Sequence, residues 1–237
     1  GRQPHGTAYA PIGPLNGGSG GARIGWLADW GGAWPFEDGI QQLCEAALGV
    51  FERTGCRVEP LAPPFSSDAL WQSWTTLRSW KVAAGLSGLY EDDSARSRLK
   101  PEALWEIERG RKFSAMQVHA ASVIRSEWFA HAAGLFEAYD ALALPTAQVW
   151  PFPLDQDWPK TIAGQTMDSY HRWMEVMVPA SLAGLPAVAI PAGFGKQGLP
   201  MGLQLIGRRN GERALLDLAE RYHRETGWPQ RQPPALA

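Results

Sequence analysis

Cysteine is scarce in this chain, with 2 residues in 237. Cys44 and Cys56 do not have the C-x-x-C spacing that zinc and redox sites use, so we expect both to be small buried apolar residues. The N-terminus also shows no charged, apolar and small-residue leader. Because neither secretion nor a disulfide framework is indicated, we expect the protein to work in the cytoplasm.

Long apolar runs and clustered positive charge are missing as well. No apolar stretch approaches the roughly 18 to 20 residues that a membrane-spanning helix needs, so we expect no membrane association. Arg208 and Arg209 form an isolated basic pair, whereas nucleic-acid binding depends on a clustered basic surface, so we expect no nucleic-acid partner. The formal net charge of −2 and the 45% hydrophobic content fit a soluble globular protein.

Metal-binding and acid-base patterns are also absent. His119 and His131 lie twelve residues apart in a predicted helix, a spacing that does not bring two imidazoles together on one metal ion. Asp155 and Asp157 are paired carboxylates in a proline-rich loop, where solvation is favoured over acid-base work. We therefore expect no metal site, no organic cofactor and no catalytic group built from these residues.

What the sequence does contain is an alternation of strand and helix periods. Residues 23–28 and 56–61 are predicted strands. The segment from Pro35 to Thr54 between them is a predicted helix, with proline at its start and Gly55 just past its end. A strand, a helix and a strand within about 35 residues fit a right-handed crossover with parallel pairing.

Helical patterns then dominate the middle of the chain, at residues 67–86, 101–109 and 114–139, before a short apolar strand at 141–144. The sequence therefore predicts an α/β fold with a mixed, largely parallel sheet flanked by helices. The helices around 67–139 would form an insertion into that fold.

The segment from Val178 to Phe194 carries the most specific pattern. It predicts a helix, a tight turn at Gly184-Leu185-Pro186 and a strand. Residues 187–190 show no polar alternation, so we expect both faces of this strand to be covered, as they are well inside a sheet. Residues 198–207 then predict the second strand of a hairpin.

This segment closely resembles the C-terminal part of the amidase signature family, in which a helix and a GLPA turn precede a strand ending in Pro and Gly, followed by G-L-P-x-G-L-Q. The resemblance covers most of residues 22–231 and implies the C-terminal part of the amidase signature fold. Further matches are Arg23-Ile24-Gly25-Trp26, Leu144-Pro145-Thr146, Pro151-Phe152-Pro153-Leu154 and Met167-Asp168-Ser169-Tyr170.

Members of that family hydrolyse a C–N bond with a Ser, a second Ser behind a cis peptide, and a Lys, all in their N-terminal half. This chain has neither G-G-S-S-G-G nor D-T-G-G-S, and the run from Gly17 to Gly21 is one Ser short with no predicted helix after it. We interpret residues 1–22 as a flexible N-terminal segment or linker and residues 23–237 as one amidase-like C-terminal α/β region. We assign no catalytic residue and expect the chain alone to be inactive.

Five residues are candidates for the substrate pocket. His171, Met174, Val178 and Ser181 are spaced by three, four and three, which predicts one helical face. The resemblance implies that this helix lines the pocket for the acyl part of the substrate, while an ordinary core stripe is the alternative. Many relatives carry Asn at the position of Ser181. Thr146 follows a strand end, where ligand contacts gather in open parallel sheets.

Two functions of different class follow. In the first, the chain supplies pocket walls to an amidase whose nucleophile lies in a separate N-terminal half, with a small-molecule amide as its substrate. In the second, it is a noncatalytic binding or scaffold protein with a degenerate amidase fold. A sheet without the N-terminal strands would expose an unpaired edge and apolar surface. The tryptophans at 71, 74, 80, 105 and 128, all in predicted helices, leave homodimerisation open.

Overall fold

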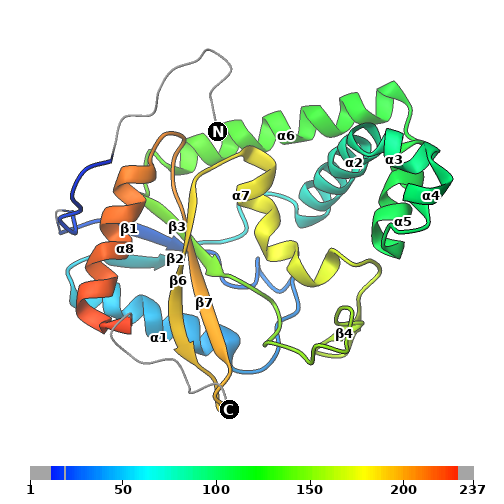
Figure 1. The fold of residues 1–237 in the computed structure, drawn as a ribbon. Coiled ribbons are helices and arrows are strands. Elements are labelled where there is room, and N and C mark those ends of the chain that lie inside the picture. Colours follow the sequence, from blue (N-terminus) through cyan, green and yellow to red (C-terminus); the bar gives the residue numbers. More distant parts are fainter. Residues whose placement is uncertain (1–11, 19, 229–237) are drawn as a thin grey trace.

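A five-stranded mixed sheet forms the centre of the computed structural model, which describes residues 12–18 and 20–228 (Figure 1). β1 pairs in parallel with β2 and β3, whereas β7 is antiparallel to both β3 and β6. β7 therefore runs opposite to the other strands, and the expected α/β fold with a mixed, largely parallel sheet is confirmed. In the order β2-β1-β3-β7-β6, the strands are Arg57–Pro60, Arg23–Trp26, Ala141–Pro145, Pro200–Ile206 and Ala187–Phe194.

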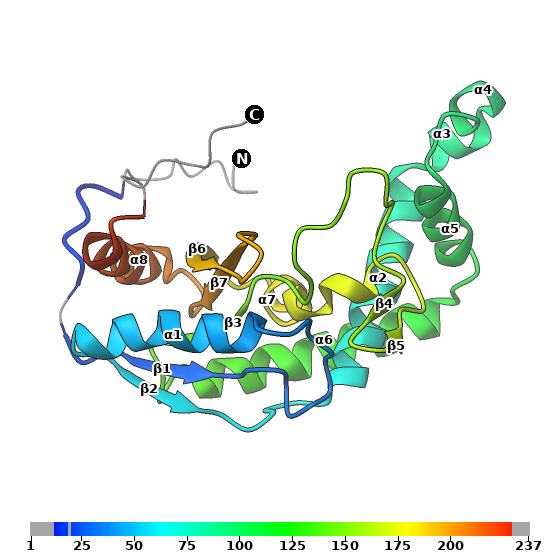
Figure 2. The same cartoon turned by 90° about the horizontal axis from the view of Figure 1, so that it is seen from below.

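Helix α1 (Ile40–Arg53) connects β1 to β2 and completes the expected parallel crossover. The prediction that this helix begins at Pro35 is wrong, because Gly39 takes a left-handed backbone with φ of 86° and the helix begins only after it. Its inner face buries Cys44 and Phe51, each 0% exposed. β1 lies between α1 and α6 (Ala115–Leu135), so the sheet is covered on both faces (Figure 2).

The segment between β2 and β3 is helical throughout its ordered elements, and three of its helices agree with the sequence prediction to within a few residues. Ser114 caps α6, accepting a hydrogen bond from the backbone N–H of Gln117 as expected for a capping box. Figure 1 shows α3, α4 and α5 projecting away from the sheet. The other helices are α2 (Ser67–Gly85), α3 (Ser87–Glu91), α4 (Asp93–Arg96) and α5 (Pro101–Gly110).

α2 and α5 cross in close contact because Gly110 has no side chain. A Cβ at this position would lie 2.1 Å from the backbone oxygen of Ser79. The two helices are further joined by Arg109, which donates to the Thr75 backbone oxygen at 3.1 Å and to the Ser79 hydroxyl at 3.2 Å. The helical segment is therefore held together by backbone proximity and polar contacts as well as by apolar packing.

β6 corrects one expectation. It lies at an edge of the sheet and pairs only with β7 among the described strands, so the prediction of a strand well inside the sheet is wrong. Ala187 and Ala189 are exposed, while Ile190 is buried. The expected polar alternation is hidden because alanine is apolar whether it faces solvent or the core, and a short apolar run does not reveal which neighbours a strand has.

The N-terminal residues that the structure describes lie along α8 (Glu212–Thr226). Three arginines of this helix donate to backbone carbonyls of residues 12–18 rather than to their side chains. Residues 1–11 and Ser19 of the predicted linker lie outside the described residues, and the domain division at residue 22 stays a prediction. The donor and acceptor pairs are Arg213 with Ile12 and Pro14, Arg221 with Gly17 and Gly18, and Arg224 with Leu15 and Asn16.

Candidate functional site

Thr146 follows the carboxyl end of β3, and its hydroxyl donates a hydrogen bond to the backbone oxygen of Gly202 on β7 at 3.1 Å. The backbone N–H of Thr146 reaches the same oxygen at 3.0 Å. A Cβ on Gly202 would lie 2.8 Å from the Thr146 side chain, so this contact requires glycine. Thr146 thereby lines a cavity of about 380 Å³ together with Trp173 and Met201, among others.

An aromatic loop after Thr146 separates this cavity from a larger one of about 860 Å³. Trp150 and Phe152 line both cavities. Trp150 is fixed by its backbone N–H, which donates to the Glu37 carboxylate at 2.7 Å, and by its indole N–H, which donates to the Asp38 backbone oxygen at 3.1 Å. The loop also contains a short hairpin of β4 (Thr161–Ile162) and β5 (Gln165–Thr166).

The predicted helical face through His171 and Ser181 is interrupted. η1 (Arg172–Met177) is a 3-10 helix with a kink at Met174, where φ is −116° and ψ is 21°, and α7 (Val178–Ala183) begins only after it. Pro179 stands in the first turn of α7, where its missing N–H is tolerated but a continuous α-helix through it is disfavoured. The expectation that the four residues share one helical face is therefore wrong.

The five candidate residues consequently lie in different surroundings. His171 and Val178 are buried, at 4% and 1% exposed, whereas Met174 is half-buried. Ser181 is exposed and lines two adjoining cavities beside α6, while Thr146 lines the cavity below the aromatic loop. Their roles as substrate-binding residues stay a prediction.

His171 sits in a buried ion-pair network that joins three elements. Its Nε2 accepts a hydrogen bond from the Arg78 guanidinium of α2 at 3.1 Å, and Arg78 in turn pairs with Glu106 of α5 at 3.0 Å. Burial, followed by the positive charges of Arg78 and Arg109, lowers the pKa of His171 to about 4. The imidazole is therefore neutral near pH 7, and its acceptor nitrogen is occupied.

Two buried glutamines that no predicted pattern singled out fix η1 over the end of β3. Gln148, 0% exposed, donates to the Pro35 backbone oxygen at 3.1 Å and accepts from the Val176 backbone N–H at 3.2 Å. Gln204 donates to the backbone oxygens of Pro145 at 2.9 Å and Val176 at 3.2 Å. Gln204 stands in the G-L-P-M-G-L-Q motif, whereas no local pattern distinguishes Gln148.

Neither thiol of the chain is poised for chemistry. Burial raises the pKa of Cys44 to about 12 and also raises the pKa of Cys56. Among the side-chain hydrogen bonds of residues 12–18 and 20–228, none joins a Ser, Thr or Cys side chain to a His or Lys. Within the same residues, no group of three His, Cys, Asp or Glu side chains is arranged to hold a metal ion.

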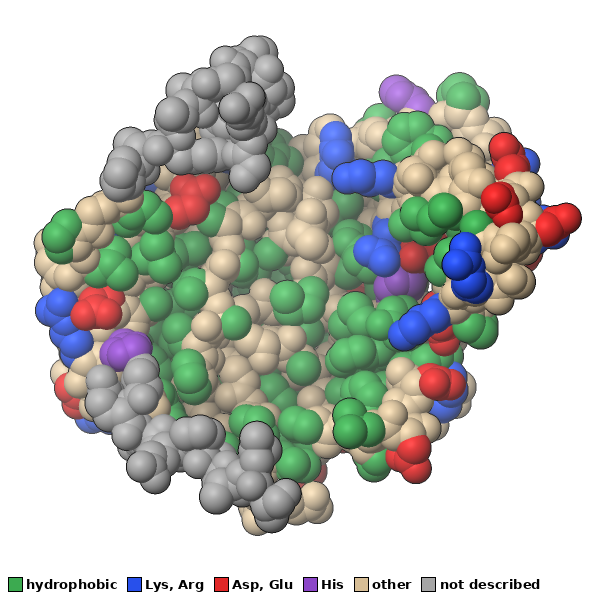
Figure 3. All heavy atoms as spheres, viewed as in Figure 1, with side chains coloured by type: hydrophobic (Ala, Val, Ile, Leu, Met, Phe, Trp, Pro, Cys, Tyr) green, Lys and Arg blue, Asp and Glu red, His purple; other side chains and the backbone are tan. Residues whose placement is uncertain are grey.

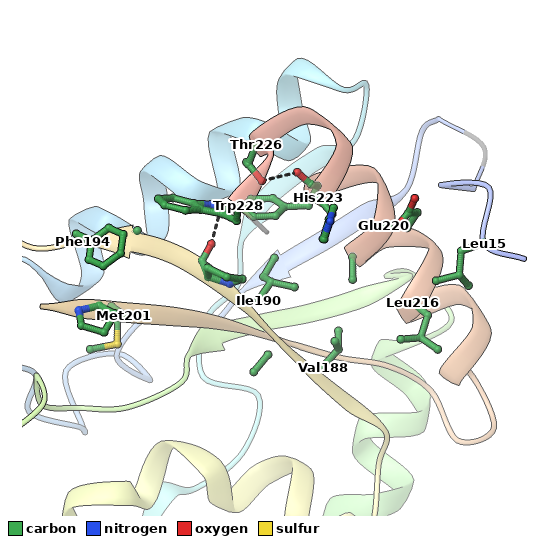
Figure 4. Close-up of a pocket in the computed structure, with 16 residues that line it drawn as sticks. Leu15, Val188, Ile190, Phe194, Met201, Leu216, Glu220, His223, Thr226 and Trp228 are labelled. Atoms are coloured by element: carbon green, nitrogen blue, oxygen red, sulfur yellow. Dashed lines mark hydrogen bonds between the residues drawn. The ribbon is translucent and has the colours of Figure 1, made fainter. Parts of the chain in front are cut away.

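A separate apolar cavity of about 670 Å³ lies between the β6 edge and α8. Val188 and Ile190 of β6 face Leu216 and His223 of α8 across it (Figure 4). Phe194 at the end of β6 also lines this cavity and is 46% exposed. The apolar surface that the sequence predicts beside an unpaired sheet edge is present at this edge.

Comparison with known proteins identifies the fold. The family model described as Amidase matches residues 12–216. The chain belongs to the amidase family. A bacterial aryl acylamidase of the amidase signature enzymes superposes with a TM-score of 0.79 at 24% identity, over 89% of this chain and 45% of that chain. 6-Aminohexanoate cyclic dimer hydrolase superposes with a TM-score of 0.74 at 18% identity, over 100% and 53% of the two chains.

Curated relatives from the amidase family are considerably longer than this chain. A putative amidase of Synechocystis sp. is 37% identical over 188 residues, which are 78% of this chain and 34% of the relative. One subunit of the glutamyl-tRNA(Gln) amidotransferase of Chloroflexus aggregans is 29% identical over 224 residues, or 83% of this chain and 43% of the relative. The chain therefore spans less than half the length of these relatives. No helix among the described residues is both long and apolar enough to cross a membrane.

Proposed function

We propose that this chain forms the pocket walls of an amidase that hydrolyses a carboxamide C–N bond through a Ser acyl intermediate, with the nucleophile in a separate N-terminal half. The observation that carries the proposal is the family match over residues 12–216 combined with coverage of only 34% and 43% of two curated relatives. The part of the relatives that the chain does not match leaves room for a nucleophile and the groups that activate it.

The five candidate residues take two kinds of role in this proposal. Thr146 and Ser181 would contact the substrate, since each lines a cavity. Met174 would face the pocket from the kink between η1 and α7. His171 and Val178 are buried and would hold the backbone of the pocket wall in place. The substrate would be a small-molecule amide, with neither a nucleic acid nor a membrane as a partner, and the protein would work in the cytoplasm.

A noncatalytic binding or scaffold protein is the second candidate. It is favoured by the high pKa of both thiols and by the neutral, hydrogen-bonded His171, which leave these groups unsuited to nucleophilic or base catalysis. Homodimerisation remains part of this candidate, because Trp80 and Trp105 are 49% and 43% exposed. Sedimentation of the purified chain would show whether it forms dimers.

Serine labelling separates the two candidates. The purified chain is treated with a fluorophosphonate, and so is the same chain fused behind the N-terminal half of the Synechocystis relative. We expect the mass of the isolated chain to stay unchanged and the fusion to gain one adduct and hydrolyse anilides or aliphatic amides. Labelling of the isolated chain would refute the assignment of the nucleophile to another segment. An inert fusion that is folded by circular dichroism would favour the binding protein.

A further inference from the structure

Two adjoining cavities lie where α2, α6 and α7 meet. One, of about 550 Å³, is lined by Arg78 and Lys81 of α2 and by Arg125 of α6, and the other, of about 490 Å³, shares Arg125 and Ser181 with it. We call the two together the α2–α6 groove. Figure 3 shows Lys and Arg side chains gathered between α7 and the helical segment, on the face that also presents β6.

The positive charge of the groove is not neutralised by its own walls. Neither cavity has an Asp or Glu among its lining residues. Lys81 and Arg125 are exposed and have no ion pair among the salt bridges of the described residues, whereas Arg78 is already paired with Glu106. The contrast is clear at the cavity beside Trp150, where Lys196 lies 3.9 Å from the Asp38 carboxylate.

Apolar side chains surround these two cations. Leu77 and Leu86 line the groove from the α2 side, and Leu182 and Phe129 line it from α7 and α6. Low-dielectric walls strengthen the field of unpaired charges and raise the local concentration of ions of opposite sign. A groove with two unpaired cations between apolar walls is therefore suited to a small organic anion rather than to a neutral amide.

The groove also borders the pocket wall of the proposed amidase. Ser181 stands in the segment predicted to receive the acyl part of the substrate, and it lines both cavities. The Ser181 hydroxyl already donates to the Val178 backbone oxygen at 3.3 Å, so the donors that remain for an anion are those of Lys81 and Arg125. The planar guanidinium of arginine matches the two oxygens of a carboxylate.

We propose that Lys81 and Arg125 form a subsite for a carboxylate on the substrate, so that the preferred amides are monoamides of dicarboxylic acids or similar amides that carry a carboxylate. This rests on the proposed amidase function for its meaning, but the subsite itself is a property of the isolated chain. Lys81 and Arg125 approach the carboxylate from opposite walls of the groove and leave the amide end free to extend toward Ser181.

Binding to the isolated chain tests the subsite without any hydrolysis. The probe is succinamate, with the uncharged succinamide and inorganic phosphate as comparisons, and the dissociation constant is read from ¹H–¹⁵N shifts of the labelled chain at fixed ionic strength. We expect succinamate to bind at least about tenfold more tightly than succinamide, since charge-assisted hydrogen bonds are about twice as strong as neutral ones. Phosphate binding as tight as succinamate would overturn the assignment to carboxylates.

Matched variants locate the site. Lys81→Gln and Arg125→Gln should each weaken succinamate binding by about fivefold to tenfold and remove the shifts around the groove. Lys112→Gln and Arg98→Gln remove the same charges from exposed positions outside the groove and should change binding less than about twofold. Unchanged binding in both groove variants, or equal loss in the controls, would overturn the subsite. Retained binding with an inert fused enzyme would instead contradict the amidase assignment alone.

Discussion

The guanidinium of Arg78 and the imidazole of His171 are joined by a hydrogen bond of 3.1 Å between Nε and Nε2, across the gap between α2 and the start of η1. The same guanidinium pairs with Glu106 at 3.0 Å, so one arginine connects two helices of the insertion to the pocket wall. Because Arg78 must donate to an unprotonated nitrogen, the contact is incompatible with a charged imidazole.

Acid should therefore weaken the fold through His171. The folded-state pKa is about 4, below the ordinary value of 6.5, so the unfolded chain binds a proton that the folded chain does not between these values. Stability should fall as pH drops from 6.5 toward 4 and level off below. His171→Gln should remove about 2 kcal/mol of the difference in unfolding free energy between pH 7 and pH 5. Urea denaturation at both pH values measures it, with the exposed His119→Gln as the control.

A side chain at Gly110 should separate α2 from α5. Gly110→Ala would bring a Cβ to 2.1 Å from the Ser79 backbone oxygen, so we expect a loss of about 3 kcal/mol or more in the free energy of unfolding. Gly134→Ala is the matched control, because a Cβ on this α6 residue meets nothing within 4 Å and should stabilise the helix by about 0.5 to 1 kcal/mol. Equal behaviour of the two variants in thermal denaturation would contradict the close crossing.

Gln148 should matter far more than an exposed glutamine. Gln148→Leu keeps the volume but leaves the Pro35 backbone oxygen and the Val176 backbone N–H without their partner, so we expect a cost of about 2 to 3 kcal/mol. Gln72→Leu on the exposed side of α2 should cost less than about 0.5 kcal/mol. Chemical denaturation gives both values, and a small cost at Gln148 would mean that these bonds do not hold η1.

The attachment of residues 12–18 to α8 should depend on Arg221. Its guanidinium donates to the backbone oxygens of Gly17, Gly18 and Thr54. Arg221→Gln removes most of these donors, so limited proteolysis should cut residues 12–18 several times faster. Arg98→Gln should leave the rate unchanged. Rapid cleavage in the unsubstituted chain would support the linker interpretation of this segment.

Local signals identified much of the fold, and tertiary context decided the rest. The cap at Ser114 gave the start of α6 within one residue. Pro35 misled the prediction for α1, because the left-handed turn at Gly39 delays the helix. The run from Ala187 to Ile190 indicated a strand correctly but not its place at the edge, since the position of a strand in a sheet depends on partners far away in the sequence.

The site was harder to predict than the fold. Spacing alone placed His171 and Ser181 on one face, whereas the kink at Met174 gives them different surroundings. Gln148 gave no signal, because its two partners are backbone groups of distant segments. Lys81 and Arg125 are 44 positions apart in the chain and belong to helices that meet only in the folded molecule.

The edge position of β6 also limits its own danger. An open strand invites another chain to add to it, and repeated addition leads to fibres. Pro191 has no N–H and follows directly on the exposed stretch Ala187–Ile190, so a continuous ladder is interrupted after a few residues. The β-bulge between Pro191 and Gly193 bends the strand at the same point. Proline and bulge together should favour one short partner strand over open-ended stacking.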